Sequence, residues 1–262
     1  MTDAPDGAAR ARTPAGEDVL LVREEPLLIE LGEDRLLTMR TPGADEDLAV
    51  GFLVSEGVIA RASDVASVAC GKKGDVDLVT VELRTGVVPI GRGRLSRAHE
   101  IRPSCGICGS ADAEGLSKGL ATLTTGWPRV SCARLLELEE TMRARQALFH
   151  ATGGAHAAAL FGSQGDLIAL GEDVGRHNAV DKALGRAVRA GRALGDTVLV
   201  LSGRGGFELV LKAFRVGVPI VASVSAPTSL AVEIAEEAGG TLVGFVRKGS
   251  VPRVYADDGR IG

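Results

Sequence analysis

The second half of the chain alternates between short apolar runs and amphipathic segments, and this pattern limits the possible folds more than any other feature. Strands are predicted over residues 155–162, 166–175, 197–203, 218–225 and 241–247. Helices are predicted over residues 178–191, 207–217 and 228–239. The runs at 197–203 and 218–225 are apolar on both faces, which is typical of parallel strands buried between helices. The pattern therefore predicts a layered α/β sheet with right-handed crossovers.

The first half of the chain is predicted to be rich in strands. Residues 19–31 are mostly apolar, and residues 75–84 alternate polar and apolar side chains as a half-buried strand does. A helix is predicted to open after Thr41-Pro42 and to end near Gly57, with acidic residues in its early turns. Acidic side chains at that end favour a helix because they face the positive end of its dipole.

Composition and pattern together divide the chain into four parts. Residues 1–17 are small and polar, and they are predicted to form a disordered tail. Residues 18–103 are predicted to form a β-rich N-terminal subdomain, and residues 104–130 a loop and connector. Residues 131–262 are predicted to form an α/β domain that opens with one amphipathic helix over 132–149.

Charge and hydropathy exclude some classes of protein. The net charge of −4 argues against a protein that coats nucleic acid. No apolar run reaches the length of a membrane span, and the N-terminus lacks the apolar core of a secretory signal. We therefore expect a cytoplasmic protein with no nucleic-acid partner and no membrane association.

The chain has four cysteines, of which Cys105 and Cys108 form a Cys-Gly-Ile-Cys pair. Two thiols at this spacing can share a metal ion, form a disulfide, or act as nucleophile and helper. A closed zinc site needs four ligands, and a second pair at zinc-ribbon spacing is missing, so zinc would have to recruit scattered residues such as His99. The zinc-deaminase signature also fails, since Ser104 separates proline from cysteine and no His-x-Glu lies upstream. No metal is expected.

Four arginines precede this pair within one predicted loop: Arg92, Arg94, Arg97 and Arg102. Cations near a thiol lower its pKa and stabilise the thiolate. This environment favours a nucleophilic sulfur and an anionic substrate, although four arginines can also be a solvated face. The remaining cysteines, Cys70 and Cys132, are predicted to be inert.

Two strand-to-helix turns are candidates for anion binding. Residues 202–206, Ser-Gly-Arg-Gly-Gly, lie where a helix begins, and the backbone N–H groups there can bind a phosphate. Residues 225–229 occupy the next equivalent turn. The alternatives are structural: glycine can serve loop geometry alone, and Thr228 or Ser229 can cap the following helix. Two such turns at one edge of a parallel sheet favour a ligand crevice.

A third turn, residues 171–178, contains Asp173, Arg176 and His177 just before a predicted helix. Such a cluster of ionisable groups can bind a ligand or take part in catalysis, and a structural role remains open. His156 follows a pair of glycines, and a structural role is favoured for it.

These motifs together resemble the formate dehydrogenase accessory sulfurtransferases, the FdhD family. The resemblance rests on stretches that occur in the family's order, at residues 104–109, 152–160, 171–185, 201–213 and 225–239, with further matches at 24–31, 41–59 and 244–255.

The resemblance implies a specific function. Members of this family take sulfur from a cysteine desulfurase as a persulfide on the Cys-x-x-Cys loop. They pass it to the molybdenum cofactor of formate dehydrogenase, in its bis(molybdopterin guanine dinucleotide) form. The resemblance also implies a homodimer. It further implies a cytidine-deaminase-like, three-layer α/β/α fold for the larger, cofactor-binding domain at 131–262, beside the smaller β-rich N-terminal subdomain.

By this resemblance the catalytic residues are Cys105 and Cys108. The cofactor-binding residues implied by the resemblance and the turns are Phe245, Val246, Arg247, Lys248, Gly249, Ser250, Gly203, Arg204, Gly205, Thr228, Asp173, Arg176 and His177. Two other functions remain open. One is a non-catalytic chaperone that binds the molybdenum cofactor. The other is a thiol–disulfide oxidoreductase, which a thioredoxin-like chain would signal by an aromatic residue before the pair instead of Ser104.

Overall fold

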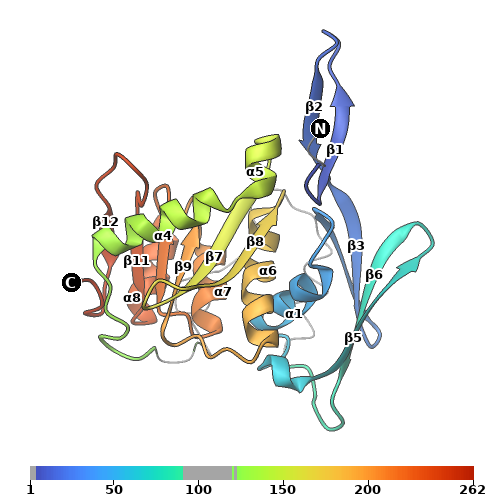
Figure 1. Cartoon of the computed structure of the whole chain (residues 1–262). Coiled ribbons are helices and arrows are strands. Elements are labelled where there is room, and N and C mark those ends of the chain that lie inside the picture. Colours follow the sequence, from blue (N-terminus) through green and yellow to red (C-terminus); the bar gives the residue numbers. More distant parts are fainter. Residues whose placement is uncertain (1–3, 91–119, 121–122) are drawn as a thin grey trace.

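The computed structural model describes residues 4–90, 120 and 123–262, and Figure 1 shows the arrangement of their helices and strands. Its largest sheet has six strands in the order β12-β11-β10-β9-β7-β8. These strands are β7 (His156–Gly162), β8 (Leu167–Asp173), β9 (Thr197–Leu201), β10 (Ile220–Ser223), β11 (Thr241–Gly244) and β12 (Arg253–Ala256). Strands β9, β10 and β11 are parallel, as predicted, whereas β7 and β12 run antiparallel to their neighbours.

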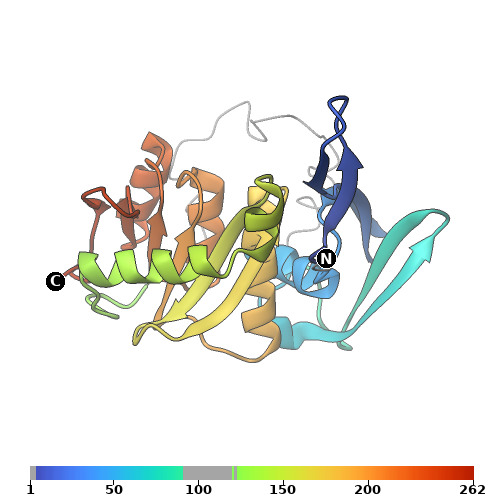
Figure 2. The same ribbon diagram turned by 45° about the horizontal axis from the view of Figure 1, so that its top comes forward.

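Helices cover both faces of this sheet (Figures 1 and 2). One face carries α4 (Cys132–Ala144), whose Leu135, Leu138 and Met142 pack against alternate residues of the strands. The other face carries α6 (Arg176–Arg189), α7 (Phe207–Arg215) and α8 (Ser229–Glu237). Because successive strand residues point to opposite faces, strands such as β7, β9 and β10 contribute to both apolar layers. The likeness to cytidine deaminases stays a prediction.

A second, four-stranded sheet lies in the N-terminal part, with the order β4-β3-β6-β5. Its strands are β3 (Glu25–Leu31), β4 (Asp34–Arg40), β5 (Val65–Lys73) and β6 (Val76–Leu83), and the short 3-10 helix η1 (Ala62–Asp64) precedes β5. The helix α1 (Asp45–Ser55) covers it, with Leu27, Ile29 and Leu53 fully buried between them. The helix predicted after Thr41-Pro42 is therefore confirmed.

The structure differs from the disordered tail predicted for residues 1–17. Strand β1 (Ala8–Arg12) pairs antiparallel with β2 (Asp18–Val22) to form a hairpin that projects from the body (Figure 1). The pairing consists of backbone hydrogen bonds, which a polar, small-residue composition does not reveal.

The single helix predicted over 132–149 is wrong, because the chain breaks after α4 and restarts as α5 (Ala147–Thr152). Gln146 leaves the helical conformation at φ −76° and ψ 72°. The carboxylate of Glu172, at the end of β8, then accepts hydrogen bonds from the backbone N–H groups of Leu148 at 3.1 Å and Phe149 at 3.0 Å. This long-range contact satisfies the free N–H groups of the new helix.

The two sheets are joined where α1 crosses α6. A Cβ atom on Gly51 would lie 1.9 Å from the carbonyl oxygen of Asp181, and one on Gly185 would lie 1.8 Å from that of Asp47. The helices therefore meet backbone to backbone, which only glycine permits.

A buried charge network extends this junction to α7. Lys212 Nζ lies 2.9 Å from Asp181 Oδ1, 2.7 Å from Glu56 Oε1 and 3.0 Å from Ser55 Oγ. Burial opposes the charge on Lys212, but its carboxylate partners outweigh that effect and raise its pKa. Paired in this way, the buried ammonium stays charged.

In the part of the chain that the structure describes, no helix has the length and apolar character needed to cross a membrane.

We predict that Gly185→Ala destabilises the protein by about 1–3 kcal/mol, since its methyl group would push α1 away from α6. Gly195→Ala is the matched control, because a Cβ there meets nothing within 4 Å and the residue needs no left-handed backbone. Urea unfolding followed by circular dichroism would measure both. Equal stability of the two variants would contradict the close crossing.

Candidate functional site

The predicted ligand-binding turns meet at one edge of the six-stranded sheet. The carboxyl ends of β9, β10 and β11 lie there because these strands are parallel. Strand β7 runs the other way, so it begins at this edge with His156, and β8 ends there with Asp173. Ligands of open α/β sheets bind outside such carboxyl ends. We call this region the carboxyl edge.

The turns after β9 and β10 are held together by backbone hydrogen bonds. The N–H of Ser225 donates to Gly203 O at 3.2 Å, and that of Thr228 donates to Gly205 O at 3.1 Å. Gly205 is buried, and a Cβ there would lie 3.2 Å from Ser223 Oγ. Gly206 precedes α7 and has no side chain with which to cap it, whereas Arg204 beside it is exposed. The start of α7 can thus present N–H groups and a cation to an anion.

Thr228 has the capping role that the sequence left open. Its Oγ1 accepts a hydrogen bond from the Ala231 N–H at 3.4 Å and so caps α8. Its contact with a ligand stays a prediction.

The segment after β11 presents a cation-rich loop. Phe245 adopts a left-handed φ of 57°, and the Arg253 guanidinium lies 5.2 Å from its ring centroid. Val246 is fully buried, so its side chain belongs to the core. Arg247, Lys248 and Gly249 are exposed, and Arg247 Nε donates to Ser250 Oγ at 3.0 Å.

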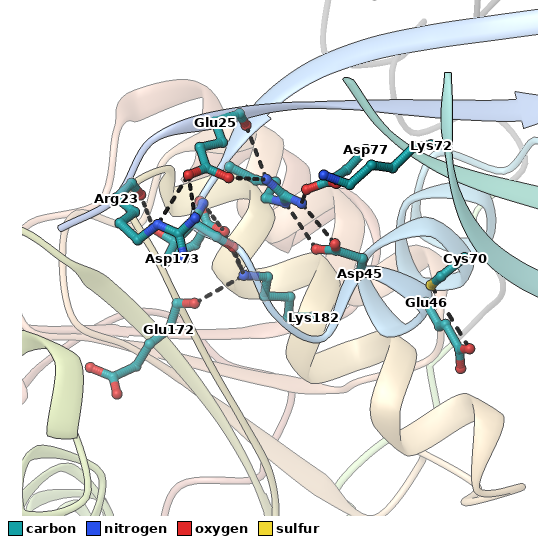
Figure 3. Close-up of polar contacts among 12 residues, drawn as sticks. Arg23, Glu25, Asp45, Glu46, Cys70, Lys72, Asp77, Glu172, Asp173 and Lys182 are labelled. Atoms are coloured by element: carbon teal, nitrogen blue, oxygen red, sulfur yellow. Dashed lines mark hydrogen bonds and ion pairs between the residues drawn. The ribbon is translucent and has the colours of Figure 1, made fainter. Parts of the chain in front are cut away.

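Asp173 is placed behind the edge rather than on it. Its side chain is fully buried, and Oδ2 lies 2.7 Å from Lys182 Nζ. Figure 3 shows the two side chains side by side. The backbone N–H groups of Thr41 and Gly175 and the Asn178 amide also donate to this carboxylate. Asp173 therefore fixes the start of α6 relative to β8 and the segment before α1.

Arg176 and His177 lie at the start of α6 and pair with Glu208 at the start of α7. His177 Nε2 lies 2.8 Å from Glu208 Oε2, and Arg176 Nη2 lies 3.7 Å from the same atom. The hydrogen bond from His177 lowers the pKa of Glu208 more than any other contact. Both side chains remain partly exposed at the carboxyl edge.

A cavity of about 440 Å³ opens at this edge, on the side of the sheet that α4 covers. Glu139, Met142 and Arg143 line it from α4, and His156, Ser202 and Arg247 line it from the strand ends. Of the predicted cofactor-binding residues, only Arg247 lines this cavity.

Sequence reasoning missed Glu139 and Arg143 and favoured a structural role for His156. A signal for Glu139 was present, since it stands four residues after Leu135 and three before Met142, on the apolar face of α4. A carboxylate on such a face is unusual.

His156 is exposed at the cavity, where its Nδ1 lies 3.8 Å from the position of a Cβ on Gly203. Desolvation by surrounding protein lowers the pKa of the imidazole, and the positive charge of Arg176 lowers it further. A neutral imidazole can accept a hydrogen bond or a proton.

The predicted catalytic cysteines, Cys105 and Cys108, lie outside the described residues, as do the four arginines before them and His99. The described cysteines are the free thiols Cys70 and Cys132. Burial and the charge of Glu46 raise the pKa of Cys70, which opposes thiolate formation. Within the described ranges, no group of three or more His, Cys, Asp or Glu side chains could hold a metal ion.

Comparisons with known proteins agree on one family. The model of the FdhD/NarQ family matches residues 22–262. The chain is 46% identical to the sulfur carrier protein FdhD of Anaeromyxobacter dehalogenans, over 99% of this chain and 96% of that protein. It is 44% identical to the sulfur carrier protein FdhD of Streptomyces avermitilis, over 98% and 92%.

A solved structure covers the same length. It is the crystal structure of a protein from Desulfotalea psychrophila, proposed to be a formate dehydrogenase accessory protein. It matches with a TM-score of 0.74 and 25% identity, over 97% of this chain and 98% of that one.

We predict that the imidazole of His156 titrates below the ordinary histidine pKa of about 6.5. Replacing Arg176 with Gln should raise the midpoint, because a neighbouring positive charge is lost. NMR titration of the ring protons would measure both. A titration midpoint at or above pH 6.5 for His156 in the unaltered protein would contradict the desolvation of this imidazole by the surrounding protein.

Proposed function

The chain belongs to the FdhD/NarQ family, and from this we propose that it is a sulfur-carrier protein required for formate dehydrogenase activity. In this proposal a cysteine desulfurase supplies the sulfur, and Cys105 holds it as a persulfide. The receiver is the molybdenum cofactor in its bis(molybdopterin guanine dinucleotide) form, which the chain binds as substrate. The protein then acts as a sulfurtransferase, as a homodimer in the cytoplasm. The names of its relatives support the sulfur-carrier role.

The observation that carries the proposal is the anion-binding character of the carboxyl edge. The uncapped start of α7 and the exposed Arg204 lie there, and Arg247 lines the cavity at the same edge. Lys248, next to Arg247 in the chain, is also exposed. These groups suit the phosphates of a dinucleotide, which backbone N–H groups and guanidinium groups bind well. The cavity beside them can receive a ring system of the same ligand.

The sulfur step follows from thiol chemistry. A thiolate at Cys105 attacks the outer sulfur of the desulfurase persulfide, forming a new S–S bond. The S–S bond of the donor breaks, and the desulfurase cysteine leaves as a thiolate, so the exchange needs no outside electrons. The arginines at 92–102 favour this step because nearby cations stabilise a thiolate.

Cys108 can then complete the delivery. Its thiolate attacks the inner sulfur of the Cys105 persulfide, a Cys105–Cys108 disulfide forms, and sulfide leaves. The two electrons that sulfide requires come from the two cysteines, so a reductant is needed only to restore the pair.

A non-catalytic chaperone for the molybdenum cofactor is the second candidate. It is favoured by one observation: the uncapped start of α7 and the exposed Arg204 can bind an anion without the help of a thiol. Formate dehydrogenase activity that survives in a strain whose only copy is Cys105→Ser/Cys108→Ser would favour the chaperone.

We predict that incubation with a cysteine desulfurase and cysteine adds about 32 Da to the intact protein, an adduct that a reducing agent removes. Cys105→Ala should abolish the adduct because it removes the accepting thiolate. Cys108→Ala should retain it, and Cys132→Ala is the matched control with an unrelated thiol removed. Intact-protein mass spectrometry would measure all four proteins, and an adduct that persists on Cys105→Ala would contradict the assignment.

A further inference from the structure

The cavity at the carboxyl edge contains a buried carboxyl group that is only half satisfied. Glu139 is 1% exposed and lines the cavity from α4. Its Oε1 lies 3.7 Å from Arg143 Nη1, whereas its Oε2 has no hydrogen-bond partner among the residues that the structure describes. Nearly all buried polar atoms in folded proteins have a partner, so this oxygen calls for an explanation.

Stability does not explain Glu139. Leu135, Leu138 and Met142 share its side of α4 and pack into the apolar layer against the sheet. An apolar residue at this position would avoid the desolvation of a carboxylate. Burial raises the pKa of Glu139, Arg143 opposes that effect, and Glu140 adds to it. A buried carboxyl group that destabilises the fold by its desolvation is typical of residues that contact a ligand.

The chemistry of the cavity restricts what Glu139 can bind. An ionised carboxylate only accepts hydrogen bonds, so the ligand must present N–H donors. The exposed Arg143 and Arg247 also line the cavity, and they favour a ligand that carries negative charge as well. The Phe149 ring and Met142 provide apolar surface for a flat ring system. A purine nucleotide whose base carries adjacent N–H donors meets all three requirements.

Guanine has this donor edge, with N1–H beside the N2 amine, and a pterin shares it. Adenine has an acceptor at N1, and hypoxanthine lacks the N2 amine. We propose that Glu139 is the specificity-determining residue of the pocket, with Oε2 accepting a hydrogen bond from the donor edge of a bound guanine base. The assignment rests on the proposed function, in which a guanine nucleotide binds at this edge. It goes further by naming Glu139 as the residue that recognises the base.

Calorimetric titration of the full-length protein with GDP, IDP and ADP tests the assignment. We expect the unaltered protein to bind GDP about tenfold to a hundredfold more tightly than IDP, since each donor to a buried carboxylate contributes strongly. Glu139→Gln should weaken GDP binding by a similar factor and bring GDP and IDP together. Glu140→Gln is the matched control, because Glu140 is the exposed neighbour on the same helix.

Three outcomes overturn the assignment in distinguishable ways. An unchanged preference for GDP over IDP in Glu139→Gln would refute the role of Glu139 and leave the nucleotide pocket intact. No GDP binding by the unaltered protein would refute the nucleotide pocket itself. Titration with 6-hydroxymethylpterin tests whether a pterin, rather than guanine, is the preferred ligand. Tighter binding of this pterin than of GDP would overturn the guanine assignment.

A stability readout separates a folding defect from a binding defect. The folded state holds the Glu139 proton more tightly than the unfolded state, so the ionised residue destabilises the free protein as pH rises. The charged groups around it are Arg143, Glu140, Arg247 and, when protonated, His156. Glu139→Gln should therefore raise the unfolding temperature more at pH 8 than at pH 5. A lowered unfolding temperature at pH 8 would overturn the view that Glu139 is retained for binding.

Discussion

The backbone contact between α1 and α6 is the constraint on which the rest of the structure depends. Gly51 and Gly185 let the two helices meet without side chains between them, and this contact brings the four-stranded sheet against the larger domain. Lys182, on α6, reaches from this junction to Asp173 at the end of β8 and to the carbonyl oxygen of Thr41. The junction therefore also fixes one end of the carboxyl edge (Figure 3).

The carboxyl edge combines two kinds of chemistry on opposite faces of the sheet. The starts of α6, α7 and α8 provide glycine-rich turns, N–H groups and the Arg176–Glu208–His177 cluster. The α4 face provides the cavity with its buried carboxyl Glu139 and two arginines. Together they suit a ligand that has phosphates at one end and a base with hydrogen-bond donors at the other. In the proposed function, the sheet binds the ligand and Cys105 carries the sulfur.

The sequence pattern predicted those strands and helices that are determined by the residues within them. The apolar runs predicted β9, β10 and β11, because a strand buried on both faces needs apolar residues throughout. The break at Gln146 was missed because a distant partner, Glu172, decides it. Strand β1 was missed because its pairing with β2 consists of backbone hydrogen bonds, which composition does not reveal. The inward position of Glu139 was missed although its place on the apolar face of α4 indicated it. The turns predicted to bind a ligand do meet at one edge, since turns after parallel strands share it. That they bind a ligand stays a prediction. Their individual roles depend on contacts, as the burial of Asp173 beneath that edge shows.

The central claim is that the carboxyl edge of the six-stranded sheet binds the nucleotide part of the substrate. Hydrogen exchange of backbone amides, measured by mass spectrometry with and without GDP, tests it most directly. The claim predicts slower exchange on GDP addition in residues 202–206, 225–228 and 245–250, with no change in the four-stranded sheet. Protection confined to β3–β6, or an unchanged exchange at all three turns under saturating GDP, would contradict it.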